Sequence, residues 1–209
     1  MSLAERVSKR IDGKVRKSDR TRERIVAAAA MLVLERRGAD FQMAEVASAC
    51  GMTKGALYYY FHDRTALVEE VFNRSVGEFV SRIEGISNAD LSSHEALEAL
   101  CGAFAEEVRQ GGTAIVALAT ELAGTPGALT RLESRVDRVT AIVQSQLERA
   151  RDAGELRADL DLGLVSSGVC GAFLFAAFHR VREGGECFDP SAFSRELMDL
   201  VSLGIVAKG

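Results

Sequence analysis

Apolar residues recur at helical spacing along most of the chain. Over residues 19–37 the apolar positions fall three and four apart, including Ile25 and Leu32, and Gly38 then offers a left-handed stop. This spacing predicts a helix over about 19–37. The same reasoning predicts further helices over about 43–50, 54–60, 64–83, 93–110, 113–122, 126–153, 162–182 and 190–206.

Capping signals mark where several of these helices begin. Thr53 and Asp63 each precede a predicted helix, and Ser92 with a Glu three residues later resembles a capping box. Thr125-Pro126 and Asp189-Pro190 each place a capping side chain before a proline at the first helical position. The prediction is an all-α protein of about nine helices.

Three segments follow from this pattern. Residues 1–18 are polar and basic without a stable apolar stripe, which indicates a flexible basic arm. Residues 19–64 form a small helical domain, and residues 65–209 form a larger helical body. Composition agrees with an all-α fold, because the chain is 47% hydrophobic, holds only 2 prolines and nowhere sustains the alternation of a strand.

Charge is divided unevenly along the chain. Through Arg64, 13 Lys and Arg residues stand against 8 Asp and Glu, whereas the remainder holds 13 against 22. A basic first third on an acidic body suggests that one end meets a polyanion. The four cysteines are scattered without metal-ligand spacing, so we expect no metal site, no cofactor and a reducing cytoplasm. Apolar runs are about ten residues at most, so we expect no membrane span.

The segment 43–61 has the pattern of a helix-turn-helix. Ala47 is small enough for two helices to cross closely, and Gly51 tolerates the positive φ of a tight turn. Leu57 and Phe61 lie one turn apart on one side of the second helix. Three adjacent tyrosines, 58–60, cannot all face one core, because successive helical residues turn by about 100°.

The exposed side of this second helix suits DNA. Lys54 can reach a phosphate or a guanine edge, and the small Gly55 and Ala56 let the backbone approach the groove. The tyrosines offer hydroxyls to phosphates and ring faces to thymine methyls. Packing alone is the alternative interpretation, and the exposed tyrosine beside Lys54 argues against it.

Through the run Gly51-Met52-Thr53-Lys54-Gly55-Ala56-Leu57-Tyr58-Tyr59-Tyr60-Phe61 and on to Leu67, the sequence resembles the TetR family of bacterial regulators. The resemblance covers about 45 residues. One departure is Met43, where the family usually starts the helix with a capping Thr; Gln42 or Asp40 can substitute. The resemblance implies DNA contacts from Thr53, Lys54, Gly55, Ala56, Tyr58, Tyr59, Tyr60 and Arg64.

The basic N-terminal arm has two interpretations. It reaches the minor groove or flanking phosphates, or it is a solvated tail. The basic residues concerned are Lys9, Arg10, Lys14, Arg16, Lys17, Arg20, Arg22 and Arg24.

The resemblance also implies a homodimer, because the last two helices of the family pair across a two-fold axis and set two recognition helices on a palindromic operator. A monomeric core was the alternative. The helix over 162–182 is apolar nearly all round and must be buried on several sides. The expected interface residues are Val169, Phe173, Phe193, Leu197 and Val201.

By resemblance, an effector pocket lies among the fourth to eighth helices and takes a small apolar or amphipathic molecule. Arg131, Arg135 and Arg138 share a helix face that either attracts an anion or is simply solvated. The candidate effector contacts are Phe79, Phe104, Leu118, Thr120, Glu121, Gln144, Phe173, Phe178 and His179.

Together these features predict a cytoplasmic, sequence-specific DNA-binding regulator, a repressor released from a palindromic operator by a small-molecule effector. A helix-turn-helix protein controlled by a protein partner, or acting without an effector, is the alternative. We do not expect an enzyme, because none of the three histidines lies in a catalytic motif.

Overall fold

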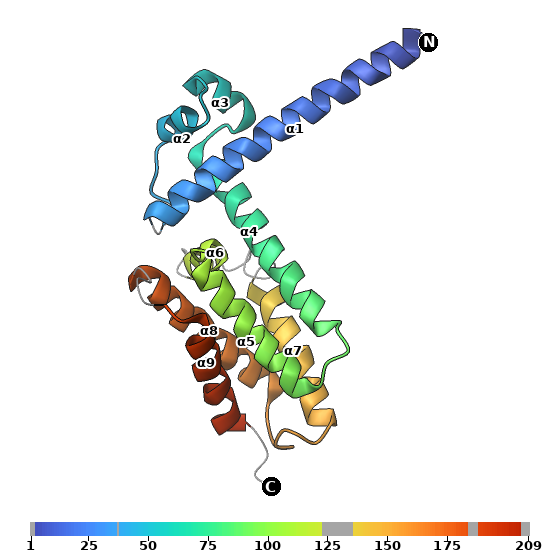
Figure 1. Cartoon of the computed structure of the whole chain (residues 1–209), viewed down its shortest axis with the longest axis vertical. Helices are drawn as coiled ribbons and strands as arrows, with labels where there is room; N and C mark the ends of the chain where they lie inside the picture. Colours follow the sequence, from blue (N-terminus) through green and yellow to red (C-terminus); the bar gives the residue numbers. More distant parts are fainter. Residues whose placement is uncertain (1–2, 37, 123–135, 184–187, 206–209) are drawn as a thin grey trace. The chain divides into compact units, whose positions relative to one another are not determined.

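The computed structural model describes residues 3–36, 38–122, 136–183 and 188–205, with the side chains of 3–17, 93, 120–122 and 201–205 left out (Figure 1). The described residues form nine α-helices. The predicted all-α fold, with an N-terminal helix-turn-helix followed by a helical body, is confirmed. The chain divides into two compact units between Asn73 and Arg74. This division lies inside a helix. The domain boundary that we predicted from the sequence lies between residues 64 and 65, and it stays a prediction.

Unit 1 contains α1 (Leu3–Arg36), α2 (Met43–Ala49), α3 (Lys54–Tyr60) and the first part of α4 (Arg64–Ser87). In Figure 1, α2 and α3 lie beside the C-terminal half of α1. The helices close over a core of fully buried apolar side chains. That core includes Ile25, Val33, Val46, Leu57 and Leu67.

The start of α1 differs from the prediction. The helix begins at Leu3 rather than near residue 19, so most of the segment expected as a separate arm is the first part of one 34-residue helix. Residues 3–18 lack proline, and six of these sixteen residues are Lys or Arg, both good helix formers. A weak apolar stripe was therefore a poor reason to end the helix at residue 19.

Unit 2 contains the rest of α4, α5 (Ser93–Arg109), α6 (Thr113–Leu122), α7 (Val136–Asp152), α8 (Leu162–Glu183) and α9 (Pro190–Ile205). The helix α5 is central, because it packs against α6, α7, α8 and most extensively α9. Three edge-to-face rings join α4, α5 and α8. Phe104 lies 5.0 Å from Phe79 and 5.5 Å from Phe173 between ring centroids.

The predicted caps are largely in place. Thr53 Oγ1 accepts a hydrogen bond from the Ala56 N–H, and Asp63 Oδ1 accepts one from the Ala66 N–H. Ser92 forms the predicted capping box with Glu95, which also holds the pKa of that carboxyl below its usual range. The Thr125-Pro126 signal lies outside the described residues.

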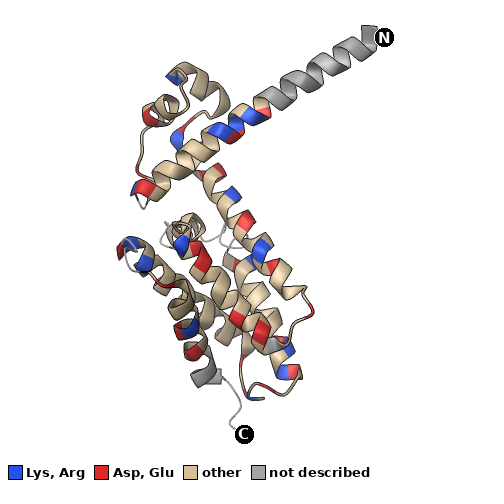
Figure 2. Ribbon diagram, viewed as in Figure 1, with Lys and Arg blue, Asp and Glu red and all other residues tan. Residues whose placement is uncertain are grey.

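The helix α8 is the most apolar long helix of the described chain. By length and composition it could cross a membrane, a test that core helices of water-soluble proteins also pass. Only 39% of its most apolar stretch is buried inside the chain. Its charged residues gather toward its C-terminal end, as Figure 2 shows.

Candidate nucleic-acid interface and effector cavity

The turn between α2 and α3 has the geometry that the sequence predicted. Gly51 has a φ of +62°, and its N–H donates to the Ser48 carbonyl at 3.0 Å. The Met52 N–H then donates to the Ala47 carbonyl at 2.9 Å, and Ala47 is buried where the two helices meet. The turn thus fixes the direction in which α3 leaves α2.

One side of α3 is anchored and the other is open. Leu57 is fully buried and Phe61 nearly so, whereas Tyr58 and Tyr59 are 41% and 81% exposed. Tyr60 is half-buried and packs edge-to-face on Tyr59. The remaining predicted DNA contacts on this side are also exposed. They are Thr53, Lys54, Gly55 and Ala56.

Two arginines of α1 contact the ends of α2 and α3. Arg22 pairs with Glu70 at 2.9 Å, stacks on the Phe61 ring at 4.3 Å and donates to the Tyr60 carbonyl at 3.4 Å. Arg24 donates to the Cys50 carbonyl at 2.9 Å. Both were candidates for DNA contact within the basic arm. In the structure they hold the helix-turn-helix together, which sequence spacing alone did not indicate, and their contact with DNA stays a prediction.

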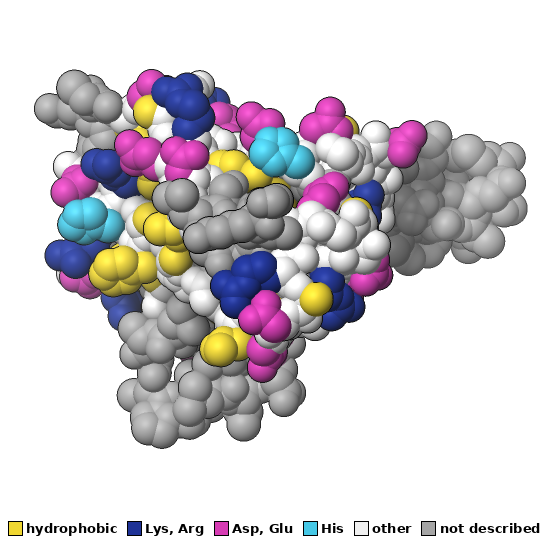
Figure 3. Space-filling view, turned by 90° about the horizontal axis from the view of Figure 1, so that it is seen from below, with side chains coloured by type: hydrophobic (Ala, Val, Ile, Leu, Met, Phe, Trp, Pro, Cys, Tyr) yellow, Lys and Arg dark blue, Asp and Glu magenta, His cyan; other side chains and the backbone are white. Residues whose placement is uncertain are grey.

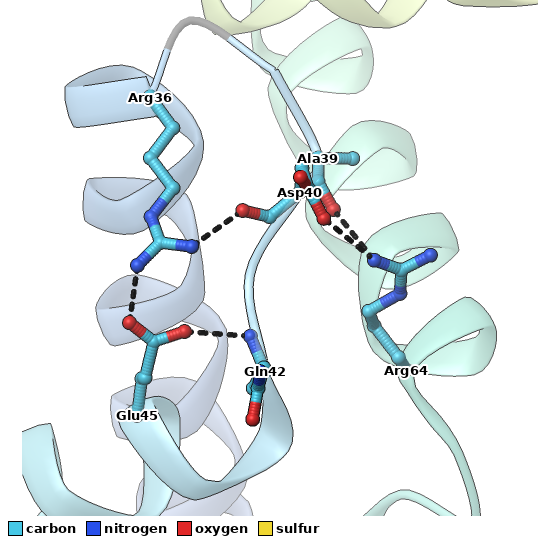
Figure 4. A network of polar contacts seen from close by, with 6 residues as sticks. All are labelled: Arg36, Ala39, Asp40, Gln42, Glu45 and Arg64. Atoms are coloured by element: carbon cyan, nitrogen blue, oxygen red, sulfur yellow. Dashed lines mark hydrogen bonds and ion pairs between the residues drawn. The ribbon is translucent and has the colours of Figure 1, made fainter.

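A polar network connects the end of α1 with the starts of α2 and α4 (Figure 4). Arg36 donates to the Asp40 carbonyl at 2.6 Å and pairs with Glu45. The Glu45 carboxylate accepts from the Gln42 N–H at 2.7 Å, so it binds the N–H of the residue that precedes α2. Arg64, a predicted DNA contact, lies 3.4 Å from the Asp40 carboxylate.

This network also explains the departure at Met43. That side chain is buried, and Gln42 rather than residue 43 is the N-cap of α2. Of the two substitutes considered, Asp40 is exposed and turned toward Arg64. A capping Thr at position 43 is therefore replaced by an apolar anchor, with Glu45 binding the backbone N–H of Gln42.

Unit 2 contains a cavity of about 230 Å³ between α5, α6, α7 and α8. Its walls are mainly apolar. The lining residues are Phe104, Leu118, Val136, Asp137, Val139, Thr140, Ser167, Cys170, Gly171 and Leu174. A cavity with apolar walls and a few polar groups is the usual form of a small-molecule site.

The polar groups of this cavity are mostly occupied within the chain. The Ser167 hydroxyl donates to the Gly163 carbonyl at 2.8 Å. Burial raises the pKa of the Cys170 thiol to about 11, against a smaller lowering by a hydrogen bond with Thr140. A thiol held protonated is a weak nucleophile. Hydroxyl oxygens and the Asp137 carboxylate therefore remain as acceptors for a ligand.

Comparison with known proteins connects these two sites. The model for bacterial regulatory proteins of the tetR family matches residues 25–71, which contain the helix-turn-helix. The model described as tetracyclin repressor-like, C-terminal domain matches residues 91–200, over half of the chain. The chain belongs to the TetR family. It is therefore a DNA-binding transcriptional regulator.

Individual relatives of the TetR family are distant. The HTH-type transcriptional regulator UidR of Escherichia coli K12 is 23% identical over 70% of this chain and 74% of its own. The fold is that of FadR from Bacillus subtilis, solved with stearoyl-CoA (TM-score 0.73, 20% identity, 86% and 96% covered). CprB from S. coelicolor A3(2) is also similar (TM-score 0.65, 26% identity, 90% of both chains covered).

Two of the predicted effector contacts, Phe104 and Leu118, line the cavity. Phe79 and Phe173 are buried and flank Phe104, so they support its wall. The side chains of Thr120 and Glu121 lie outside the described residues.

The remaining predicted contacts have other partners. Gln144 donates to Glu148 at 3.0 Å, and His179 lies 3.0 Å from Glu183. The guanidinium carbon of Arg182 lies 5.9 Å from the ring centroid of Phe178. Lining residues that sequence reasoning missed, such as Ser167 and Gly171, are small residues with no sequence signal for a ligand.

The predicted anion-attracting face is only partly described. Arg138 lies 3.6 Å from Glu84, whereas Arg131 and Arg135 lie outside the described residues. The face of the molecule seen in Figure 3 mixes acidic, basic and apolar side chains, so no single charge dominates it.

The predicted interface residues are placed in the core of unit 2. Val169 and Phe173 on α8, and Phe193 and Leu197 on α9, are all buried within one chain. Val201 lies outside the residues whose side chains are described. These four residues therefore face the core of their own chain, and their place in a dimer interface stays a prediction. Large exposed apolar side chains on the same helices are Leu164, Phe175 and Leu200.

Proposed function

We propose that the protein is a cytoplasmic, homodimeric repressor. It binds a palindromic operator through the exposed face of α3 and releases the operator when a small apolar or amphipathic molecule fills the cavity of unit 2. The observation that carries the proposal is the exposure of Lys54, Tyr58 and Tyr59 on a helix anchored by Leu57. Exposed aromatic and basic side chains beside one another suit a phosphate-lined groove.

The effector part of the proposal rests on the cavity. Its apolar walls favour a molecule that buries carbon rather than one that carries several charges. FadR from Bacillus subtilis was solved with stearoyl-CoA. SmeT, the repressor of the Stenotrophomonas maltophilia multidrug efflux pump SmeDEF, has a similar fold (TM-score 0.67, 19% identity) and forms a complex with triclosan. Both molecules have large apolar parts, which supports an apolar ligand class here.

The test of DNA binding is selection of bound sequences from a random duplex pool at near-physiological salt. We expect an enriched palindrome with half-sites about 10 base pairs apart, as two recognition helices on a two-fold axis require. Binding without any enriched sequence, lost steeply as salt rises, would instead mean a non-specific polyanion binder.

The selected operator then supports an effector screen. We expect small apolar compounds that bind in the cavity to release labelled operator from the protein. A variant with Leu118→Trp fills the cavity and should no longer respond to a compound that releases the parent protein. Control by a protein partner would leave the operator bound in every compound pool.

A further inference from the structure

The C-terminal end of α3 is held by one side chain of α1. Arg22 donates from Nη2 to the Glu70 carboxylate of α4 at 2.9 Å, and from Nη1 to the Tyr60 carbonyl at 3.4 Å. The same guanidinium stacks on the ring of Phe61, the residue that follows α3, at 4.3 Å from the ring centroid. One arginine therefore joins α1, α3 and α4 at a single point.

These three contacts suit a guanidinium in particular. Its planar fork stacks on a ring with its face and donates from its edge, whereas a lysine ammonium has no flat face to stack. The Tyr60 carbonyl is among those that a helix leaves without an intrahelical partner at its C-terminal end, where a positive charge is favourable. Glu70 holds the guanidinium at this position through a charge-assisted hydrogen bond.

The direction of α3 depends on such contacts. The helix has seven residues, too few to be stable on its own, and it is about 10 Å long. The turn at Gly51 fixes its start, and the buried Leu57 fixes its middle. A tilt of about 10° would move its released end by about 2 Å, several times the range of lengths that a hydrogen bond to a base edge allows.

Such a tilt should affect sequence reading before it affects general DNA affinity. Contacts with base edges depend on a narrow geometry and carry the sequence preference. Contacts with phosphates carry no sequence preference, and their attraction is electrostatic. A protein that has lost the anchor of α3 should therefore still bind DNA but distinguish its operator less well.

Charge alone gives a different expectation for the same two residues. A carboxylate in a DNA-binding unit repels phosphates, so removal of Glu70 should then strengthen binding to any duplex. Arg22 would be a phosphate contact, but its side chain is half-buried and its guanidinium is already engaged by three groups. For Glu70, the two explanations predict changes of opposite sign.

We propose that Arg22 and Glu70 are positioning residues for operator recognition. Their pair fixes the C-terminal end of α3, and it sets the preference for operator over other DNA through α3 rather than through a DNA contact of its own. This inference rests on the proposed operator binding by α3. It gives an acidic residue of α4 a part in sequence recognition.

The first test replaces the acid in the full chain. Glu70→Ala removes the pair, and the protein should stay folded because partly exposed ion pairs contribute little to stability. We expect affinity for the selected operator to fall about tenfold, while affinity for a shuffled duplex of the same length stays equal or rises. Fluorescence anisotropy with both duplexes measures this ratio. The matched control is Glu23→Ala, which removes the same charge from an exposed position of α1 and should leave the ratio unchanged.

The ratio of the two affinities separates positioning from a purely structural role. Loss of folded protein lowers the apparent affinity for both duplexes by the same factor, so it does not change their ratio. Circular dichroism and the melting temperature report folding independently. Glu70→Gln keeps the length of the side chain and a neutral acceptor for Arg22, so it should lower the ratio by a smaller factor than Glu70→Ala.

The second test replaces the base. Arg22→Lys keeps the positive charge but loses the stack on Phe61, so the ratio should fall although the charge is unchanged. Arg22→Ala should keep the parent salt slope on the shuffled duplex, whereas loss of one phosphate contact per chain would make the slope of a dimer about two units shallower. The double variant with Glu70→Ala should lose no more operator affinity than the more affected single variant.

The outcomes distinguish this inference from the proposed function. Operator affinity that is unchanged or raised in Glu70→Ala would overturn the positioning role and leave operator binding by the parent chain standing. A shallower slope in Arg22→Ala, or additive losses in the double variant, would also overturn it, because the two residues would then act separately. A parent chain that enriches no sequence would overturn the proposed function and this inference with it.

Discussion

At the scale of single residues, Lys54 on the exposed face of α3 and Glu107 in the interior of unit 2 carry charges in opposite surroundings. Lys54 lies with its ammonium 5.8 Å from the Tyr58 ring centroid, a loose cation–π contact that leaves it free to reach a phosphate. Glu107 is buried, and its carboxylate accepts from the Ala114 N–H at the start of α6 and lies 3.6 Å from Arg82. The first charge is available to a partner, and the second is committed within the chain.

Removal of the exposed charge should weaken DNA binding without unfolding the protein. Lys54→Ala loses one phosphate contact per chain, so a dimer should bind its operator with a salt slope about two units shallower. Melting temperature should stay within about 1 °C, since surface substitutions change the free energy of unfolding little. The measurement is operator affinity across a salt series. An unchanged slope would mean that Lys54 does not contact a phosphate.

The buried charge should give a pH-dependent stability difference. Burial raises the pKa of Glu107, partly offset by the Ala114 N–H and Arg82, so the folded state binds a proton more readily than the unfolded state. The stability that this proton contributes is present at low pH and lost as pH rises through the folded pKa.

Glu107→Gln keeps an acceptor for the Ala114 N–H and removes this titration. We expect the variant to gain stability relative to the parent chain as pH rises from about 4 to 7.5, measured by thermal unfolding at each pH. Arg82→Gln serves as a comparison that removes the cation instead. A stability difference independent of pH would show that the Glu107 pKa is not shifted.

At the scale of elements, sequence patterns predicted what depends on local chemistry. Gly51 fixed the helix-turn-helix turn, and the Ser92 capping box marked the start of α5. Patterns did not predict which apolar residues of α8 are buried, because Phe173 and Phe175 have the same chemistry and opposite burial. That difference is set by which neighbours α8 packs against, and helical periodicity carries no information about the neighbour.

Two tight turns, at Gly51 and Gly112, should respond differently to one added methyl group. Gly51 and Gly112 have φ of +62° and +69°, and a left-handed conformation costs a residue with a Cβ about 1–2 kcal/mol. Around Gly51 no atom lies within 4 Å of an added Cβ, whereas at Gly112 it would lie 2.3 Å from Val181 Cγ2. Overpacking of that kind costs about 1–3 kcal/mol more.

Gly112→Ala should therefore destabilise the protein by about 2–5 kcal/mol and Gly51→Ala by about 1–2 kcal/mol. Chemical denaturation followed by circular dichroism measures both. Equal losses would show that Val181 moves aside without cost, and the turn between α5 and α6 would then be less tightly held by α8 than the structure indicates.

At the scale of the whole molecule, the charge gradient along the chain gives the last prediction. Residues 1–18 hold six Lys and Arg against two acidic residues, and from Leu3 they continue α1 of the DNA-binding unit as one helix. We therefore expect this basic helix to reach phosphates that flank the operator. A chain that begins at Ser18 should keep its preferred operator, because α3 is unchanged, but bind it with a shallower salt slope. The measurement compares both chains on a long duplex and on one trimmed to the operator. A difference confined to the long duplex would assign residues 1–17 to flanking phosphates, while equal slopes on both would leave them as a solvated extension of α1.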